Sequence, residues 1–418
     1  MVNVVEKVQA GEKLPKGWKW VKLGDVCDTS TENRDPRLMP DLPFQYVDIA
    51  SVDNASKRIL DLKTLLGRDA PSRARQVIRT GNVIVSTTRP NLNAVALVPQ
   101  ELENQICSTG FCVLRPSKAI ELSYLFNFVQ SSEFVQNLSN LVKGALYPAV
   151  TDRQVLAQSI PLPPLPEQKR IVGILSDRLT AIDKARTATE TQLKAAKALP
   201  AAYLRQVFDS AEAQKWKIKR LGDVLEDIVA GKSLKCDERP ARLDEWGVLK
   251  VSAVSWGKFK PEQNKVLPEY FIPLSEHEVK AGDLLISRAN TTELVGAVVL
   301  VEEGTRSLLM LSDKTLRLIP TTQADKGYLE LALRERMARE YIEEHGTGTS
   351  DSMKNISQET IRNIPILLPP ISKQIEIAEA QGKRQPEIER VIQILQSQLN
   401  TINQLSAATL RQAFNGEL

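Results

Sequence analysis

The chain repeats itself once, and this internal duplication constrains its fold more than any other feature. Residues 18–26 return as residues 216–224 with six of nine positions identical. The two copies of this segment are 198 residues apart (216 minus 18). This period is far longer than the roughly 20–50 residues of a solenoid repeat, so it indicates a duplicated module. Three further segments return in the same order: 81–86 as 282–287, 163–168 as 369–374, and 204–208 as 410–414.

The composition is that of an ordinary globular protein, with 42% apolar and 25% charged residues among 418. The apolar run at 295–301 is far shorter than a membrane helix, and no charged-then-apolar leader opens the chain. Four cysteines without metal spacing indicate a reducing compartment. We therefore expect a cytoplasmic protein with no membrane partner, no metal and no cofactor.

Each copy ends in a segment with the spacing of a long amphipathic helix. Counting alternately four and three residues predicts one apolar seam in each copy, which is typical of a coiled coil. The first seam is weak in its middle and the second at its ends, so the two helices invite pairing with each other. The seam positions are Leu175, Leu179, Ile182, Arg186, Thr189, Leu193, Ala196, Pro200, Tyr203 and Val207, then Gln381, Gln385, Ile388, Ile392, Leu395, Leu399, Ile402, Ser406, Thr409 and Ala413.

Connectivity sets the direction of this pair. The first helix reaches the second domain through a short link, and the second helix leaves that domain about 150 residues later. If they lie side by side, the second must run back, which makes the pair antiparallel. Forty-odd residues at 1.5 Å rise give a helix of roughly 60 Å. Pro200 and Pro386 are expected to kink or interrupt the helices, because proline lacks an amide donor.

The regions before the helices alternate short β-branched runs with turn residues, as at 83–85, 94–98, 248–251 and 297–301. Helical stretches follow near 122–141 and 328–344. The predicted fold class is therefore α/β: two pseudo-symmetric mixed α/β domains and an antiparallel two-helix coiled coil. The predicted boundaries are domain 1 at 1–160, helix 1 at 161–210, domain 2 at 211–365 and helix 2 at 366–418.

Neither domain is a bulk polycation. Residues 16–160 carry 17 Lys and Arg against 14 Asp and Glu, and residues 214–365 carry 23 against 24. Any affinity for nucleic acid must therefore come from local placement. One local cluster consists of Arg73, Arg75 and Arg79. Taken alone, such a cluster is more often a solvated face.

Donor-rich loops follow the repeated glycine-led strands. Arg, Asn, Ser and Thr side chains supply the groups that bind phosphates and base edges. A third loop, at 346–355, corresponds by position to residues 143–148 of the first copy. Each loop alone is compatible with a solvated turn, and together they are the candidate DNA-binding residues. With the arginines of the basic cluster, these are Arg73, Arg75, Arg79, Thr87, Thr88, Arg89, Asn91 and Asn93 in the first copy, and Ser287, Arg288, Asn290, Thr291, Thr292, Thr349, Ser350 and Lys354 in the second.

No catalytic constellation is visible. His277 and His345 lack a triad or metal partner nearby and are expected at the surface. Residues 231–233 resemble the end of a phosphate-binding loop, but Glu226 stands where its first glycine is required. Trp18, Trp20 and Trp216 are expected to be packing residues. We therefore predict a chain that is not itself an enzyme.

The repeated motifs together resemble the specificity subunit of type I restriction-modification systems. The resemblance spans nearly the whole chain, and its most specific motif is the Pro-Leu-Pro-Pro-Leu-Pro-Glu-Gln stretch at 161–168. It implies that each globular domain is a target-recognition domain reading half of a bipartite site in double-stranded DNA. It also implies a coiled coil that sets the gap between the half-sites.

The same resemblance implies partners: two methyltransferase subunits docked on the helices, which restriction subunits join. Glu167, Gln168 and Arg170 are then candidate partner-binding residues. Gln374 is the candidate in the second copy, where Ser372 and Lys373 depart from the Pro-Glu pattern.

Two alternatives stay open at the level of sequence. A protein scaffold that bridges two partners through its domains explains the duplication but leaves the Arg- and Asn-rich loops without a role. An enzyme with an unrecognised site is the other alternative. Salt-sensitive binding to short duplexes separates DNA recognition from scaffolding.

Overall fold

The computed structural model describes residues 14–28, 30, 32–142, 148–255, 258–350 and 353–418. Contacts within the chain divide it into two units. Unit 1 comprises residues 1–191 and 395–418, and unit 2 comprises residues 192–394. Each unit therefore holds one globular domain and half of each long helix.

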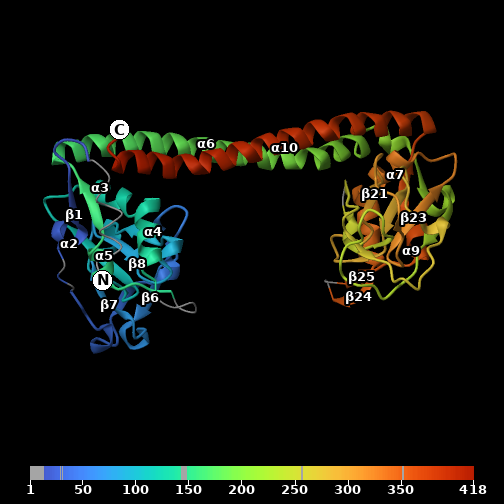
Figure 1. Ribbon diagram of the computed structural model, residues 1–418. Helices are drawn as coiled ribbons and strands as arrows, with labels where there is room; N and C mark the ends of the chain where they lie inside the picture. The colour runs from blue at the N-terminus through green and yellow to red at the C-terminus, as the bar shows by residue number, and fades with distance from the viewer. Residues whose placement is uncertain (1–13, 29, 31, 143–147, 256–257, 351–352) are drawn as a thin grey trace. The chain divides into compact units, whose positions relative to one another are not determined.

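Unit 1 is built on two four-stranded sheets (Figure 1). The sheet β2-β11-β8-β9 is antiparallel. The sheet β6-β3-β10-β7 contains one parallel pair, β3 with β10. The bounds are β2 Cys27–Asp28, β3 Pro43–Val47, β6 Lys63–Leu66, β7 Ala74–Ile78, β8 Val83–Ser86, β9 Val95–Leu97, β10 Gln105–Ser108 and β11 Phe111–Pro116. Two ribbons add β1 Lys19–Lys22 with β12 Ser159–Leu162, and β4 Val52–Asp53 with β5 Arg58–Ile59.

Unit 2 repeats this topology. The sheet β14-β23-β19-β21 corresponds to the first sheet, and β18-β15-β22 corresponds to the second, again with one parallel pair, β15 with β22. The bounds are β14 Leu225–Ala230, β15 Gly247–Leu249, β18 Asn264–Val266, β19 Leu284–Ser287, β21 Val298–Leu300, β22 Leu309–Met310 and β23 Thr315–Pro320. The ribbons are β13 Lys217–Arg220 with β26 Pro365–Leu368, and β16 Val254–Ser255 with β17 Lys258–Phe259. A further sheet joins β20 Ala289–Asn290, β25 Met353–Asn355 and β24 Thr347–Ser350.

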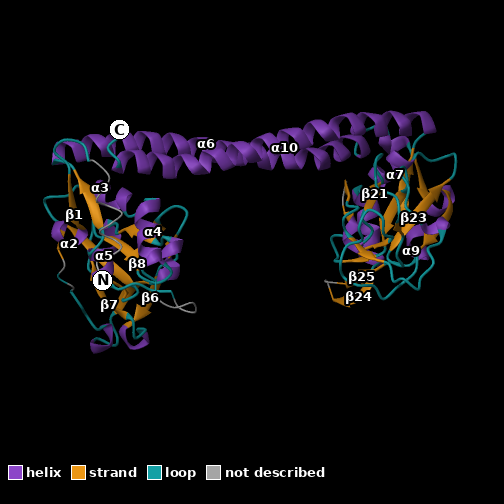
Figure 2. Ribbon diagram, in the orientation of Figure 1, coloured by secondary structure: helices purple, strands orange, loops and turns teal. Residues whose placement is uncertain are grey.

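Each predicted helical stretch of the globular domains is two helices rather than one. Ser131 and Glu335 interrupt the stretches, because each accepts a backbone amide and starts a new helix. The pairs are α3 Leu122–Phe128 with α4 Ser132–Asn140, and α7 Lys326–Ala332 with α8 Arg336–His345. The short helices α2 Leu23–Val26, α5 Asp152–Leu156 and α9 Gln358–Arg362 complete the domains (Figure 2).

The long helices have equal length, as the constant offset between the copies predicts. α6 spans Leu165–Phe208 and α10 spans Ile371–Phe414. Pro200 and Pro386 do not interrupt them, which corrects the expected breaks, since one missing donor leaves the neighbouring turns intact.

The pairing of the helices is antiparallel within each unit. Arg178 Nη1 lies 3.4 Å from Gln412 Oε1 in unit 1, and the Arg384 guanidinium lies 4.3 Å from the Tyr203 ring centre in unit 2. Early residues of α6 thus meet late residues of α10, and late residues meet early ones. Every predicted seam position is buried or half-buried, which confirms the coiled coil.

The ends of the helices belong to the domain cores. Phe414 packs edge-on against Tyr124 and Phe128, each with ring centres 5.2 Å apart. In unit 2, Phe208 lies 6.0 Å from Tyr328 and 6.3 Å from Trp216. This packing explains the repeated Leu-Arg-Gln-x-Phe segment, because burying one such ring stabilises the fold by about 1.5–3 kcal/mol.

Candidate nucleic-acid interface

In unit 2, the sheet β20-β25-β24 joins two of the predicted loops. Asn290 pairs with Lys354 across β20 and β25, and the Arg288 carbonyl accepts the Ile356 amide at 2.9 Å. Lys354 Nζ donates to the Gly348 carbonyl at 3.1 Å. In Figure 2 the sheet lies on the side of the domain away from the long helices α6 and α10. Loops more than 50 residues apart in sequence thus form one polar surface.

Beside this sheet runs a lysine-lined groove of about 440 Å³. The Arg288 amide donates to the Lys314 carbonyl at 2.9 Å and connects the groove to the sheet. Lys250 and Lys265 lie 3.6 Å and 2.5 Å from the Glu238 carboxylate. The groove-lining polar residues are Lys232, Ser233, Glu238, Lys250, Ser252, Lys265, Ser312, Asp313 and Lys314.

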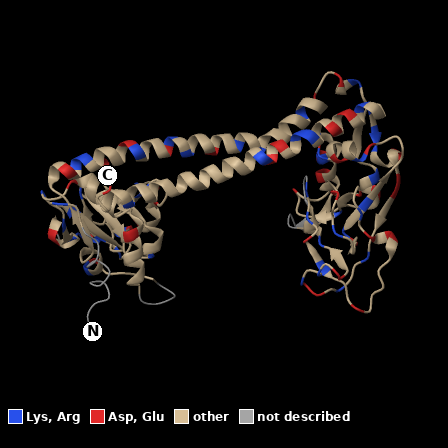
Figure 3. Cartoon of the chain, turned by 45° about the horizontal axis from the view of Figure 1, so that its top comes forward, with Lys and Arg blue, Asp and Glu red and all other residues tan. Residues whose placement is uncertain are grey.

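The groove combines ammonium groups and hydroxyls, as a phosphate-binding surface does. Three of its four lysines are, however, paired with carboxylates, since Lys314 also lies 3.5 Å from Asp313. Sequence reasoning missed it, because its lysines are spread over residues 232–314 and become neighbours only in the fold. The one signal was the Gly231-Lys232-Ser233 segment, which failed as a nucleotide loop. Figure 3 shows the Lys and Arg positions of unit 2 interspersed along the chain with Asp and Glu positions, so the unit as a whole is not strongly basic.

In unit 1, the loop after β8 is held against residues 148–150. The Arg89 amide donates to the Pro148 carbonyl, and Thr88 forms a bridge with Ala149. Arg89 and Asn93 adopt left-handed backbone conformations, with φ of 50° and 47°. A left-handed backbone conformation is uncommon for a residue with a side chain as large as arginine. Arg89 and Asn91 are exposed.

The structure brings Arg73 to this loop and separates the rest of the basic cluster from it. The Arg73 carbonyl accepts the Thr109 amide, and the adjacent Gly110 carbonyl accepts the Thr87 amide. Arg75 lies 3.3 Å from the Asp35 carboxylate, while Arg79 lies 2.6 Å from Glu32. The predicted DNA contacts of Arg75 and Arg79 are therefore corrected, because the charges of both side chains are paired within the domain.

Several predicted DNA-binding side chains instead hold their loops in place. Thr87 is buried and donates to the Gly110 carbonyl at 2.9 Å, and Ser287 is fully buried. A buried hydroxyl cannot meet a base edge, so these two predictions are wrong in this conformation. Asn93 donates to the Gln130 carbonyl, and the Asn290 side chain accepts the Thr291 amide.

The remaining candidates lie on the loop surface or beyond the description. Thr291 is exposed and Thr292 half-buried. The side chains of Thr349 and Ser350 lie outside the described part of the structure, although their backbone belongs to β24.

The predicted partner contacts Gln168 and Gln374 are buried tethers within their own units, and this corrects the prediction. Gln168 Oε1 accepts the Glu121 amide at 2.7 Å, and its Nε2 donates to the Ala119 and Pro163 carbonyls. Gln374 makes the matching bonds with the Asp325 amide and the carbonyls of Gln323 and Pro369. Each glutamine fixes the start of a long helix to the domain body.

Glu167 and Arg170 stay at the surface. Their side chains form a two-bond ion pair at 2.7 Å, and this pairing lowers the pKa of the Glu167 carboxyl. Arg170 also donates to the carbonyl of Leu418. The pair is available to a partner while it ties the two helix ends of unit 1 together.

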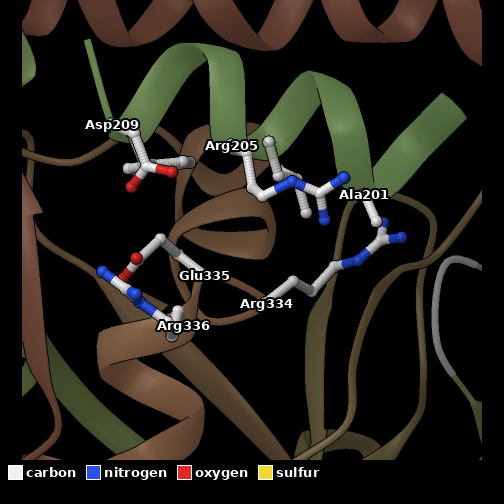
Figure 4. Close-up of a pocket in the computed structure, with 8 residues that line it drawn as sticks. Ala201, Arg205, Asp209, Arg334, Glu335 and Arg336 are labelled. Carbon is white, nitrogen blue, oxygen red and sulfur yellow. The ribbon is translucent and has the colours of Figure 1, made fainter. Parts of the chain in front are cut away.

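A separate cavity of about 310 Å³ lies in unit 2 between the end of α6 and the α7–α8 turn (Figure 4). Arg205 and Arg334 extend toward one side of it, and Asp209, Glu335 and Arg336 lie on the other. Burial raises the pKa of the Glu335 carboxyl and lowers that of the Arg334 guanidinium.

Comparison with known proteins gives the identity of the repeated module. The family model described as type I restriction modification DNA specificity domain matches residues 15–195 and again 213–404. The chain belongs to this family. The two matches cover the two copies that the internal repeat defines.

Relatives of the type I specificity family match over nearly the whole chain or over one part of it. The EcoKI specificity subunit of Escherichia coli K12 is 28% identical over 424 residues, covering 97% of this chain and 90% of that protein. The EcoEI specificity subunit of Escherichia coli is 37% identical over 164 residues, which are 39% of this chain and 27% of that subunit.

Solved structures of this family share the fold. The HsdS subunit of Thermoanaerobacter tengcongensis is 31% identical, with a TM-score of 0.64 and coverage of 98% and 100% of the two chains. A chain from a type I R-M system, studied for its complex assembly and conformational transition, is also 31% identical, with a TM-score of 0.79 and coverage of 97% and 100%. The family resemblance found in the sequence is therefore confirmed.

Type I specificity subunits are the DNA-recognition components of restriction-modification systems, and they act with methyltransferase and restriction subunits rather than as catalysts.

The positions of the two histidines agree only in part with the sequence prediction that both lie at the surface. His345 is exposed and stacks on Tyr341, whereas His277 is buried. Within the described residues no helix is long and apolar enough to cross a membrane, and no group of three acidic, His or Cys side chains is placed to hold a metal ion.

Proposed function

We propose that the chain reads a bipartite site in double-stranded DNA, one half with each globular domain. The observation that carries this proposal is the repetition of a polar loop surface at equivalent positions of both units. Arg89 follows β8 in unit 1, and its amide donates to the Pro148 carbonyl in the loop before α5. Arg288 follows β19 in unit 2, and its carbonyl accepts the Ile356 amide in the loop before α9. We also propose the division into recognition domains at 1–160 and 211–365 and spacer helices at 161–210 and 366–418.

The test is methylome sequencing of a strain that carries this chain with its system, and of the same strain with the chain deleted. The expected result is a motif of two short half-sites with an unread gap that disappears on deletion. A single continuous motif would contradict two-part reading. Absence of salt-sensitive binding to short duplexes would favour the scaffold alternative, which binds no DNA.

We further propose that two methyltransferase subunits dock on the long helices, that restriction subunits join them, and that the complex acts in the cytoplasm. Apolar side chains left exposed on the helices support this: Leu199 at 48%, Val391 at 45% and Ile394 at 48% in unit 2. Native mass spectrometry is expected to give two methyltransferase subunits per chain. Val391→Asp with Ile394→Asp is expected to reduce that ratio, and an unchanged ratio would place the docking surface elsewhere.

The helices are also proposed to set the gap between half-sites. Four residues inserted at 195–198 add about 6 Å and rotate the following helix by about 40°. Because duplex DNA rises about 3.4 Å per base pair, the unread gap is expected to lengthen by one or two base pairs. An unchanged gap in an active variant would mean that the helices act only as a tether.

A further inference from the structure

Both units expose a leucine in the same place. Leu38 is 81% exposed and Leu243 is 80% exposed, and each follows an arginine, Arg37 or Arg242. Each lies in the loop that enters the central strand of the mixed sheet, β3 in unit 1 and β15 in unit 2. A single exposed leucine is ordinary. An exposed leucine that recurs in equivalent loops of two otherwise divergent copies indicates a shared role.

The loop of unit 1 is held rigidly. Asp35 accepts the Arg37 amide at 3.0 Å and the Arg37 guanidinium at 2.9 Å, and begins the 3₁₀ turn Pro36–Leu38. The Gly67 amide, just after β6, donates to the Leu42 carbonyl at 3.0 Å. A Cβ at Gly67 would lie 2.2 Å from the Met39 carbonyl, so the two backbones pack too closely for any side chain.

The loop of unit 2 reaches the same result with different bonds. Glu245 accepts the Arg242 amide at 2.9 Å and pairs with both terminal nitrogens of Arg239 at 2.7 and 2.8 Å. The Val266 amide in β18 donates to the Arg239 carbonyl of the loop. This bond corresponds to the one in unit 1 from the Gly67 amide to the Leu42 carbonyl. Arg306 donates to the carbonyls of Ala241 and Glu245. Both leucines are thus presented on fixed backbones, and little conformational entropy remains to be lost on binding.

Each loop borders the candidate nucleic-acid interface of its own unit. In unit 1, Arg75 pairs with Asp35, and Arg73 lies two residues earlier in the chain. In unit 2, Glu238 at the start of the loop lines the lysine groove and pairs with Lys265. Each leucine loop is therefore connected through these residues to the candidate interface of its own unit.

We propose that Leu38 and Leu243 each contact the bases of bound DNA as an apolar wedge that partly unstacks one base step in each half-site. This inference rests on the proposed DNA-reading function. DNA-binding proteins use leucine and other apolar side chains in this way to distort the duplex. In unit 1, Met39 and Leu42 of the same loop are also exposed, at 56% and 57%. The apolar surface of either loop is still smaller than the roughly 800 Å² that each partner buries in a standard protein interface, so a protein partner fits the pattern less well than DNA.

The test uses the chain in complex with its methyltransferase subunit, and duplexes that carry the motif found by methylome sequencing. The fluorescent base 2-aminopurine replaces in turn each adenine of the half-sites, gap and flanks except the adenine that is methylated, because a methyltransferase flips that base out of the duplex by itself. With the unchanged chain, a fluorescence rise on binding is expected at one step in each half. Leu38→Ala is expected to abolish the rise in one half only, and Leu243→Ala in the other. Each variant is expected to bind about tenfold more weakly, the scale of one buried leucine.

The matched control is Ile218→Ala, which removes an apolar side chain that is 64% exposed on β13, outside both surfaces. It is expected to leave affinity and fluorescence unchanged. Failure of the unchanged chain to bind the motif would overturn the proposed function itself. Normal binding without a fluorescence rise, or a rise that survives both substitutions, would overturn the wedge alone. Loss of the methyltransferase subunit on Leu38→Ala or Leu243→Ala would assign the leucines to a protein contact and also overturn it.

Discussion

Unit 1 and unit 2 agree in what holds them together and differ in what they present to a ligand. Tyr124 and Tyr328 are both buried and donate to the carbonyls of Pro161 and Leu367. The glutamine tethers match bond for bond. By contrast, the end of α6 in unit 2 faces Arg334 and Arg336, where the matching turn of unit 1 has Gln130 and Ser132. The two copies thus share their buried hydrogen bonds, whereas their surface residues differ.

The comparison predicts that one domain can be replaced without affecting the other. Exchanging residues 16–160 for those of another family member is expected to change one half of the recognised motif completely and leave the other half as it was. Methylome sequencing of the chimera measures this, and the reciprocal exchange of 214–365 is the control. A change in both halves would show that the domains read DNA jointly.

Removal of the glutamine tethers is expected to have the next largest effect, which is on stability. Gln168→Ala and Gln374→Ala each leave one amide and two carbonyls without a partner, so each is expected to lower the free energy of unfolding of its unit by about 2–4 kcal/mol. Urea denaturation, with hydrogen exchange at the Glu121 and Asp325 amides, measures the loss. Gln192→Ala, at an exposed position of α6, is the control and should be nearly neutral. A large loss in one unit and none in the other would break the equivalence.

The loop arginines test whether the two surfaces do the same work. Arg89→Ala and Arg288→Ala are each expected to cost about 1–3 kcal/mol of DNA binding and to relax one motif position if the side chain reads a base. Arg79→Ala is the control, because its guanidinium is paired with Glu32. An even loss across all sequences would instead identify a phosphate contact. Normal binding by both variants would refute the assignment.

The smallest effect concerns pH. Arg37 lowers the pKa of the Asp35 carboxyl to about 2, and Arg239 lowers that of Glu245 to about 2. Since both values lie below the roughly 4 of an unfolded chain, the ionised carboxylates stabilise the loops above that pH, and the contribution is lost as pH falls to about 2. Carboxyl NMR titration checks both values. Asp35→Asn and Glu245→Gln are expected to remove this pH dependence from the Arg37 and Arg242 amides, and ordinary pKa values would contradict it.

Most of the fold was predictable from the sequence, because the residues that both copies share are mainly those that pack in the cores. A repeated Phe or Gln at constant offset indicates a position that the core or a helix tether requires, and the seam positions follow from helical period alone. The domain helices were predicted less well, since the breaks at Ser131 and Glu335 depend on single capping bonds.

The candidate site was harder to predict because side-chain type does not reveal exposure. Ser287 and Arg288 are neighbours in a polar loop, yet one is buried and the other half-buried. The lysine groove takes its four lysines from four separate segments, so a local sequence pattern does not predict it. Gln168 was misassigned for the opposite reason: a motif that identifies the family marks a structural bond rather than a partner contact.

The glutamine tethers give each long helix a fixed angular phase relative to its own domain. With about 100° of rotation per residue, one inserted residue turns everything beyond it by more than a quarter of a circle, whereas seven leave a residual of only about 20°. Length changes in α6 or α10 are therefore tolerated in steps rather than continuously. Among natural variants of this architecture, insertions and deletions in the helices are expected to cluster near whole numbers of turns.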